Sequence, residues 1–141
     1  MAVSNIERFD ELTGQVLAML YAEFPLPIRL PPEKFVVDWW VTNEHIGAPV
    51  PTRDTKFFIA TVTWLADAGY LRYQSLDPAQ LLGFENAVLT AKGLELLKAI
   101  PDSLGGSFGD RLSAAVATEG REGLRALASQ VLGTGVALLL R

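Results

Sequence analysis

The sequence predicts a mostly α-helical α+β protein with a long N-terminal helix, a core that includes a two-stranded hairpin, and a helical C-terminal appendage. Apolar residues recur every three or four positions through most of the chain, which indicates amphipathic helices. Residues 70–73 and 84–89 have instead the character of short strands around a turn. The chain has 141 residues, 50% of them hydrophobic, which is enough for one domain with a packed core.

The first helix is expected over residues 6–24. Ser4 or Asn5 can cap its N-terminus, and the acidic residues that follow suit the positive end of the helix dipole. Pro25 and Pro27 end the helix. Its apolar face consists of residues at helical spacing, namely Ile6, Phe9, Leu12, Val16, Met19, Leu20 and Phe24.

A second helix is expected to begin at Pro32, because proline fits the first turn of a helix. A short extended piece, residues 28–30, precedes it. The stretch 42–52 is rich in glycine and proline and is expected to form turns. The apolar surface of the second helix would be Phe35, Val36, Trp39 and Trp40.

A third helix of about 16 residues is expected next, with Thr52 or Asp54 as its N-cap. Gly69 is expected to end it in the left-handed conformation. The inner face of this helix would be Phe58, Thr61, Val62 and Leu65.

A strand at residues 70–73 should follow this helix, and a turn should begin at Asp77-Pro78. The second strand, residues 84–89, would complete a hairpin. Thr90 is expected to cap a fourth helix that ends at Pro101 and turns Leu94, Leu97 and Ile100 inward.

The composition changes in the last third of the chain, where residues 103–109 resemble a flexible joint. The 32 residues after this joint, 110–141, are expected to form two shorter helices, because Gly120 and Gly123 weaken a single long one. The chain is therefore divided into a core domain, residues 1–101, and a helical appendage, residues 102–141.

Two segments carry motifs. Residues 64–71 read WLADAGYL, and residues 88–97 read VLTAKGLELL. The first resembles the end of the recognition helix in winged helix-turn-helix domains of bacterial regulators, and the second resembles their LTxKGxxLL step from the second wing strand into the next helix. The resemblance spans about residues 28–100 and implies a winged-helix-like core with a two-stranded wing. The tail from Asp102 does not match these regulators; it is similar to tails of uncharacterised bacterial proteins and implies no function.

The resemblance also implies that residues 52–68 enter the major groove of DNA. Affinity for duplex DNA comes mainly from Lys and Arg side chains that neutralise phosphates. Residues 52–73 carry three basic and two acidic residues, the wing at 74–84 has no Lys or Arg, and the chain as a whole has a net charge of −4. Nucleic acid is therefore an electrostatically weak partner, and DNA-binding regulation is the alternative function. Its candidate contacts are Thr52, Arg53, Thr55, Lys56, Thr63 and Arg72.

The preferred function is a non-enzymatic binding module that acts through self-association and a protein partner. Adjacent residues on a helix point about 100° apart. One helical face therefore cannot bury both residues of the pair Trp39-Trp40, or both residues of the pair Phe57-Phe58. Aromatic side chains left at the surface are typical anchors of protein interfaces. The candidate interface residues are Trp39, Trp40, Phe57 and Trp64. We expect a homo-oligomer, most simply a dimer, that forms through the first helix or the tail, together with contact to another protein.

The residue types argue against an enzyme. The chain has no cysteine and a single histidine, His45, which excludes thiolate metal sites, cysteine nucleophiles and histidine-rich sites. No catalytic residue, cofactor site or metal site is expected. The N-terminal residues lack the pattern of a signal peptide, and the apolar run 131–140 is too short to span a membrane. We therefore expect a cytoplasmic protein with no membrane span.

Overall fold

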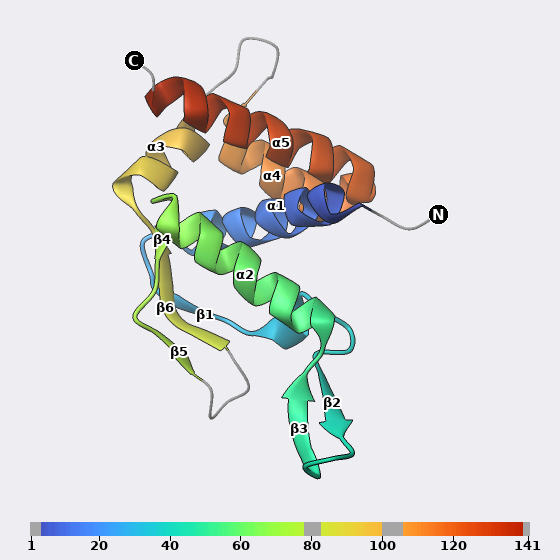
Figure 1. Ribbon diagram of the computed structural model, residues 1–141. Coiled ribbons are helices and arrows are strands. Elements are labelled where there is room, and N and C mark those ends of the chain that lie inside the picture. Colours follow the sequence, from blue (N-terminus) through green and yellow to red (C-terminus); the bar gives the residue numbers. More distant parts are fainter. Residues whose placement is uncertain (1–3, 78–82, 100–105, 140–141) are drawn as a thin grey trace.

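The computed structural model describes residues 4–77, 83–99 and 106–139 (Figure 1). This part of the chain is an α+β fold, mostly helical, with five α-helices and two small antiparallel sheets. The expected fold class is thereby confirmed. No helix among these residues is long and apolar enough to cross a membrane.

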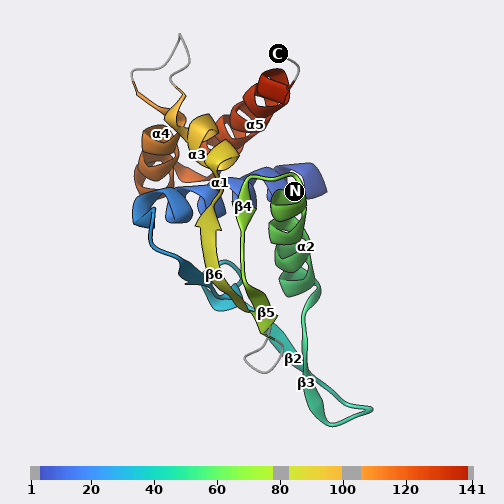
Figure 2. The same cartoon turned by 90° about the vertical axis from the view of Figure 1, so that its left-hand side faces the viewer.

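The first helix, α1 (Asn5–Glu23), lies at the centre of the molecule. The hydroxyl oxygen of Ser4 accepts a hydrogen bond from the backbone N–H of Glu7 (3.1 Å) and caps the helix as expected. Helix α1 contacts α2, α4, α5 and strand β6, so other elements of the same chain cover most of its surface (Figures 1 and 2). Its buried apolar residues are Leu12, Val16, Leu17, Ala18 and Leu20.

Strand β6 (Gly83–Leu89) is the centre of the larger sheet. It pairs antiparallel with β1 (Ile28–Leu30) on one side and with β4 (Leu71–Arg72) and β5 (Ser75–Asp77) on the other. The two strands expected from the sequence are thus confirmed as β4 and β6. The short extended piece forms a third strand, β1, at the opposite edge.

The prediction of a second helix that begins at Pro32 is wrong. A three-residue 3-10 turn, η1 (Pro32–Lys34), takes its place, and the chain then forms a hairpin of β2 (Trp40–Asn43) and β3 (Ala48–Pro51). The carbonyl oxygens of residues 38 and 39 accept hydrogen bonds from the hydroxyls of Thr52 (2.5 Å) and Thr55 (2.6 Å). In a helix that ends before Thr42, the carbonyls of residues 38 and 39 would have no partner within the helix. The threonine hydroxyls satisfy them in the observed structure, so tertiary contacts override the helical spacing of the aromatic residues.

The hairpin, residues 40–51, extends away from the rest of the molecule beside the N-terminal end of α2 (Figures 1 and 2). None of its residues is buried. We refer to the other described elements, which share the hydrophobic core, as the body.

Helix α2 (Arg53–Asp67) and helix α3 (Ala91–Lys98) agree with the sequence-based prediction. Each begins after a threonine whose hydroxyl oxygen accepts a backbone N–H: Thr52 at α2 (3.2 Å) and Thr90 at α3 (3.1 Å). Gly69 follows α2 with a φ of +90°, as expected for a residue that must be left-handed. Ile100 and Pro101, the expected end of α3, lie outside the described residues, as does Pro78 in the expected turn.

The C-terminal segment forms two helices, as expected, but the glycines do not interrupt the second one, which begins at Gly120 and continues through Gly123. Helix α4 (Phe108–Ala114) and helix α5 (Gly120–Leu139) are separated by a π-helical turn, η3 (Ala115–Glu119). The prediction of a flexible joint over 103–109 is wrong for residues 107–109. Ser107 caps α4, and Phe108 and Gly109 are buried residues of that helix.

Both C-terminal helices pack against α1 within the same chain (Figure 1). Their buried residues Phe108, Leu112 and Leu124 belong to the same hydrophobic core as Leu12 and Val16 of α1. The segment expected as an appendage therefore contributes directly to the core of the body.

Candidate binding surfaces

The two sequence motifs meet where α2 ends and α3 begins. The hydroxyl of Thr90 donates a hydrogen bond to the carbonyl oxygen of Gly69 (2.5 Å). The ammonium group of Lys92 donates to the carbonyl oxygen of Ala68 (2.7 Å) and lies 4.7 Å from the ring centre of Tyr70. A cation at the carboxyl end of a helix is favourable, because the helix dipole places partial negative charge there.

The glycine of the second motif allows this close approach. A Cβ atom built on Gly93 would lie 2.0 Å from the carbonyl oxygen of Tyr70, a backbone atom. Any other residue would push α3 away from the end of α2. The residues that carry the resemblance therefore have a structural role that is independent of any ligand.

An apolar hollow lies between α1 and the outer surface of α2. Its volume is about 250 Å³, and it is lined by Phe9, Phe57, Ala60, Thr61 and Trp64. The rings of Phe9 and Trp64 meet edge to face, with their centres 5.3 Å apart. Trp64 nevertheless remains 50% exposed. We refer to these five residues as the Trp64 groove.

The four candidate interface residues fall into two groups. Phe57 and Trp64 belong to the Trp64 groove, whereas Trp39 and Trp40 lie at the base of the hairpin with their ring centres 6.2 Å apart. Trp40 is 44% exposed, while Trp39 and Phe57 are half-buried. The sequence did not indicate that Phe9 of α1 completes the groove, because that contact exists only in the folded chain.

The structure changes part of the set of candidate DNA contacts. The assignment of Thr55 as a DNA contact is wrong, because this residue is fully buried and its hydroxyl donates a hydrogen bond to the carbonyl oxygen of Trp39. Its spacing from Phe58 and Val62, three and seven residues, places it on the inner face of α2. The hydroxyl of Thr52 is engaged in the helix cap and the bond to residue 38 described above. Thr63 is half-buried.

The basic candidates do not form one stripe. Arg53 and Lys56 are exposed at the N-terminal end of α2, whereas Arg72 follows its C-terminal end. The 15 residues of α2 span about 22 Å, so the two groups are separated by the length of the helix. The nearby Arg8 is already paired, since it lies 3.0 Å from Asp54 and 5.5 Å from the ring centre of Phe57.

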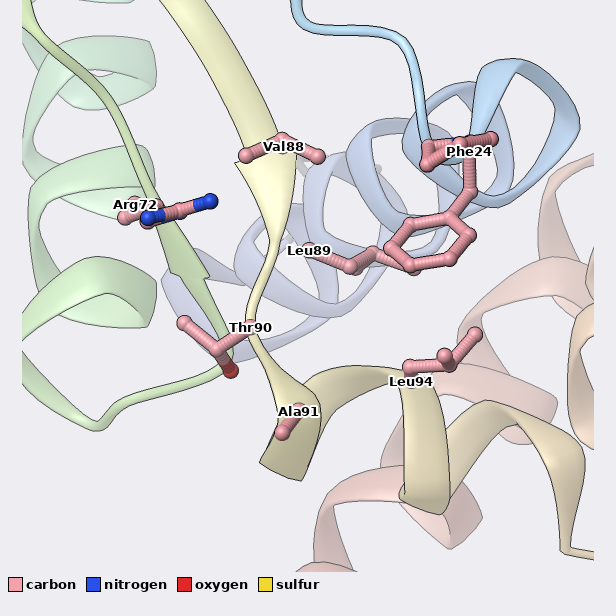
Figure 3. Close-up of a pocket in the computed structure, with 8 residues that line it drawn as sticks. Phe24, Arg72, Val88, Leu89, Thr90, Ala91 and Leu94 are labelled. Atoms are coloured by element: carbon pink, nitrogen blue, oxygen red, sulfur yellow. The ribbon is translucent and has the colours of Figure 1, made fainter.

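The side chain of Arg72 points toward β6, away from α2, at a second hollow (Figure 3). This hollow has a volume of about 510 Å³ and an otherwise mostly apolar lining, which consists of Phe24, Pro25, Val88, Leu89, Thr90, Ala91 and Leu94. Arg72 therefore belongs to a different surface from Arg53 and Lys56.

Two titratable side chains in the described part of the chain have a shifted pKa. Burial raises the pKa of Asp10 and of Tyr70 above their ordinary values, and neither residue lines the hollows described here. His45 is exposed in the hairpin turn, where its backbone N–H donates to the side-chain oxygen of Asn43 (2.9 Å). Within the described ranges, no cluster of three or more His, Cys, Asp or Glu side chains could hold a metal ion.

Comparisons with known proteins do not assign a family. No protein-family model, no curated protein and no solved structure matches this chain significantly. The winged-helix resemblance therefore stays a prediction from the two sequence motifs.

Proposed function

We propose that this protein is a non-enzymatic binding module that acts through self-association and through contact with a protein partner. The observation that carries the proposal is the exposed Trp64 at the lip of an apolar groove on the outer surface of α2. Tryptophan at the edge of a partly filled hollow is typical of the residues that dominate protein interfaces.

The charges near the groove support a protein partner over a polyanion. Asp54 neutralises Arg8, and Asp67 lies on the exposed surface one turn beyond Trp64. Only Arg53 and Lys56 supply exposed cations on α2, and the structure pairs neither with an acid among the described residues. Two cations are few beside the six to ten phosphate contacts that DNA-binding proteins typically make.

The hairpin supports self-association. Val37, at 95% exposure, precedes it, and Trp40, Val41 and Ile46 within it are exposed. Trp40, Val41 and Ile46 lie on an element that projects from the body and contributes none of the buried residues of the core. A second molecule could therefore cover them without any rearrangement of the body.

The first experiment measures mass by light scattering on a size-exclusion column over a range of protein concentrations. We expect the apparent mass to rise toward that of a dimer as the concentration increases. A strict monomer at every concentration would contradict the self-association part of the proposal.

The second experiment tests the groove with a matched pair of variants. Trp64→Glu places a charge in the groove, while Lys56→Glu changes an exposed residue of the same helix by two charge units outside it. We expect proteins that cross-link to the wild-type chain to be lost with Trp64→Glu and retained with Lys56→Glu. The opposite pattern would favour an electrostatic surface and contradict the assignment to the groove.

DNA-binding regulation is the second candidate, because Arg53 and Lys56 are exposed on α2. A titration of labelled duplex DNA at low and moderate salt separates the two functions. Submicromolar affinity with a steep salt dependence, reduced by Lys56→Glu, would favour DNA. We expect weak binding that Lys56→Glu barely changes.

A further inference from the structure

The hairpin forms a two-stranded sheet whose two outer edges meet no other strand in the described part of the chain. A sheet edge presents unpaired N–H and C=O groups that can bind a further strand. A two-stranded hairpin is also marginally stable by itself in water. Which backbone groups point outward decides whether either edge can accept a strand.

The register of the hairpin settles this point. Trp40 lies opposite Pro51, Val41 opposite Val50, and Thr42 opposite Pro49. At the next position, the N–H of Thr52 donates to the carbonyl oxygen of Trp39 (3.4 Å). Antiparallel pairs alternate between bonded and non-bonded, so Val41 and Val50 bond across the hairpin. The backbone groups of the Trp40–Pro51 and Thr42–Pro49 pairs therefore point outward.

The two edges differ in what they offer. On β3 the outward positions are Pro49 and Pro51, which have no N–H, and prolines of this kind protect an edge against pairing. On β2 the outward positions are Trp40 and Thr42, and each presents both an N–H and a C=O. Strand β2 has no charged residue and no proline, so it lacks the usual protection.

We propose that β2 is the edge through which two copies of this chain pair antiparallel, so that two hairpins form one four-stranded sheet. The inference rests on the proposed self-association and names its surface. A second copy fits this edge because β2 is self-complementary. In an antiparallel pair centred on Val41, Trp40 of each copy lies opposite Thr42 of the other, so the outward N–H and C=O groups of these residues are all paired. The blocked β3 edges would then lie outside and stop assembly at the dimer.

The direct test is Thr42→Pro, which removes one outward N–H per copy and leaves the Val41–Val50 bonds of the hairpin in place. We expect dimerisation to weaken by about tenfold or more, measured by analytical ultracentrifugation. The circular-dichroism signal of the Trp39–Trp40 pair reports whether the hairpin is still formed. A dimer of unchanged affinity with an intact hairpin would overturn the proposal.

A gain-of-assembly variant keeps the test decisive even if Thr42→Pro unfolds the hairpin. The double substitution Pro49→Thr and Pro51→Thr restores outward N–H groups on β3, so both edges become open. We expect species larger than a dimer, because an open edge would remain at each end of the assembly. A double variant that stays dimeric would overturn the proposal.

The outcome for the wild-type chain separates this proposal from the proposed function. If the wild-type chain dimerises and neither variant changes its assembly, only the assignment to β2 fails. If the wild-type chain is a strict monomer, the self-association part of the proposed function fails together with the β2 edge. Dimerisation lost in Thr42→Pro and extended in the double variant supports both.

Discussion

The body and the hairpin are built in opposite ways. Helices from both ends of the chain bury their apolar side chains in one core, and the C-terminal α4 and α5 pack on the N-terminal α1. The hairpin buries none of its side chains and is tied to the body through the backbone carbonyls of residues 38 and 39. The difference teaches that the body holds the fold, whereas the hairpin leaves its apolar side chains Trp40, Val41 and Ile46 exposed.

The largest expected effect breaks the body at its C-terminal part. Phe108 is fully buried in the core, so Phe108→Ala should lower the free energy of unfolding by about 3–5 kcal/mol, measured by urea denaturation. Val116, a few residues further along and 50% exposed, provides the control: Val116→Ala should change it by less than about 0.5 kcal/mol. A small effect of Phe108→Ala would show that residues 102–141 are a true appendage.

The next effect concerns the close contact between α3 and the end of α2. Gly93→Ala places a Cβ against the carbonyl oxygen of Tyr70, and we expect a loss of about 3 kcal/mol in the free energy of unfolding. Gly133→Ala is the matched control, because a Cβ there meets nothing within 4 Å. That change should be neutral or stabilise the chain by up to about 1 kcal/mol through helix propensity. Equal effects at the two sites would contradict the close approach.

Two neighbouring valines mark the boundary between the two regions. Val36 is 5% exposed and belongs to the core, whereas Val37 is 95% exposed. Val36→Ala should cost about 2 kcal/mol in the free energy of unfolding, and Val37→Ala less than about 0.5 kcal/mol. Thermal denaturation of the two variants side by side measures the difference. If Val37→Ala were the more costly change, Val37 would be packed against the body, contrary to its exposure in the structure.

The body was largely predictable because its signals are local. The caps Ser4, Thr52 and Thr90 each precede a helix within one turn, and Gly69 ends α2 where the sequence indicated. Each signal acts between residues only a few positions apart. Neither the packing of α4 and α5 on α1 nor the π-helical turn between them has such a signal.

The hairpin was not predictable because its signal is long-range. Trp39 and Trp40 have the spacing of a helix relative to Phe35 and Val36, and two prolines argue against a strand at 48–51. The hydroxyl of Thr55, 16 positions after Trp39, donates a hydrogen bond to the carbonyl oxygen of Trp39. This contact favours the extended form over the helix. The Trp64 groove was predictable in part. Phe57 and Trp64 of α2 were identified from the sequence, but Phe9, which completes the groove, comes from α1.

The smallest of these effects tests the motif itself. Lys92 donates to the last turn of α2 and lies over the ring of Tyr70, so Lys92→Met should lower the free energy of unfolding by about 1 kcal/mol. Lys98→Met removes an exposed lysine from the last turn of α3, where it has only a screened dipole interaction, and should cost less than about 0.5 kcal/mol. The measurement is urea denaturation at low and high salt, and the cost of Lys92→Met should shrink only slightly with salt, because the bond is part-buried. Equal costs for the two lysines would mean that the motif does not join α2 to α3, and that the body, like the hairpin, depends there on contacts the sequence does not reveal.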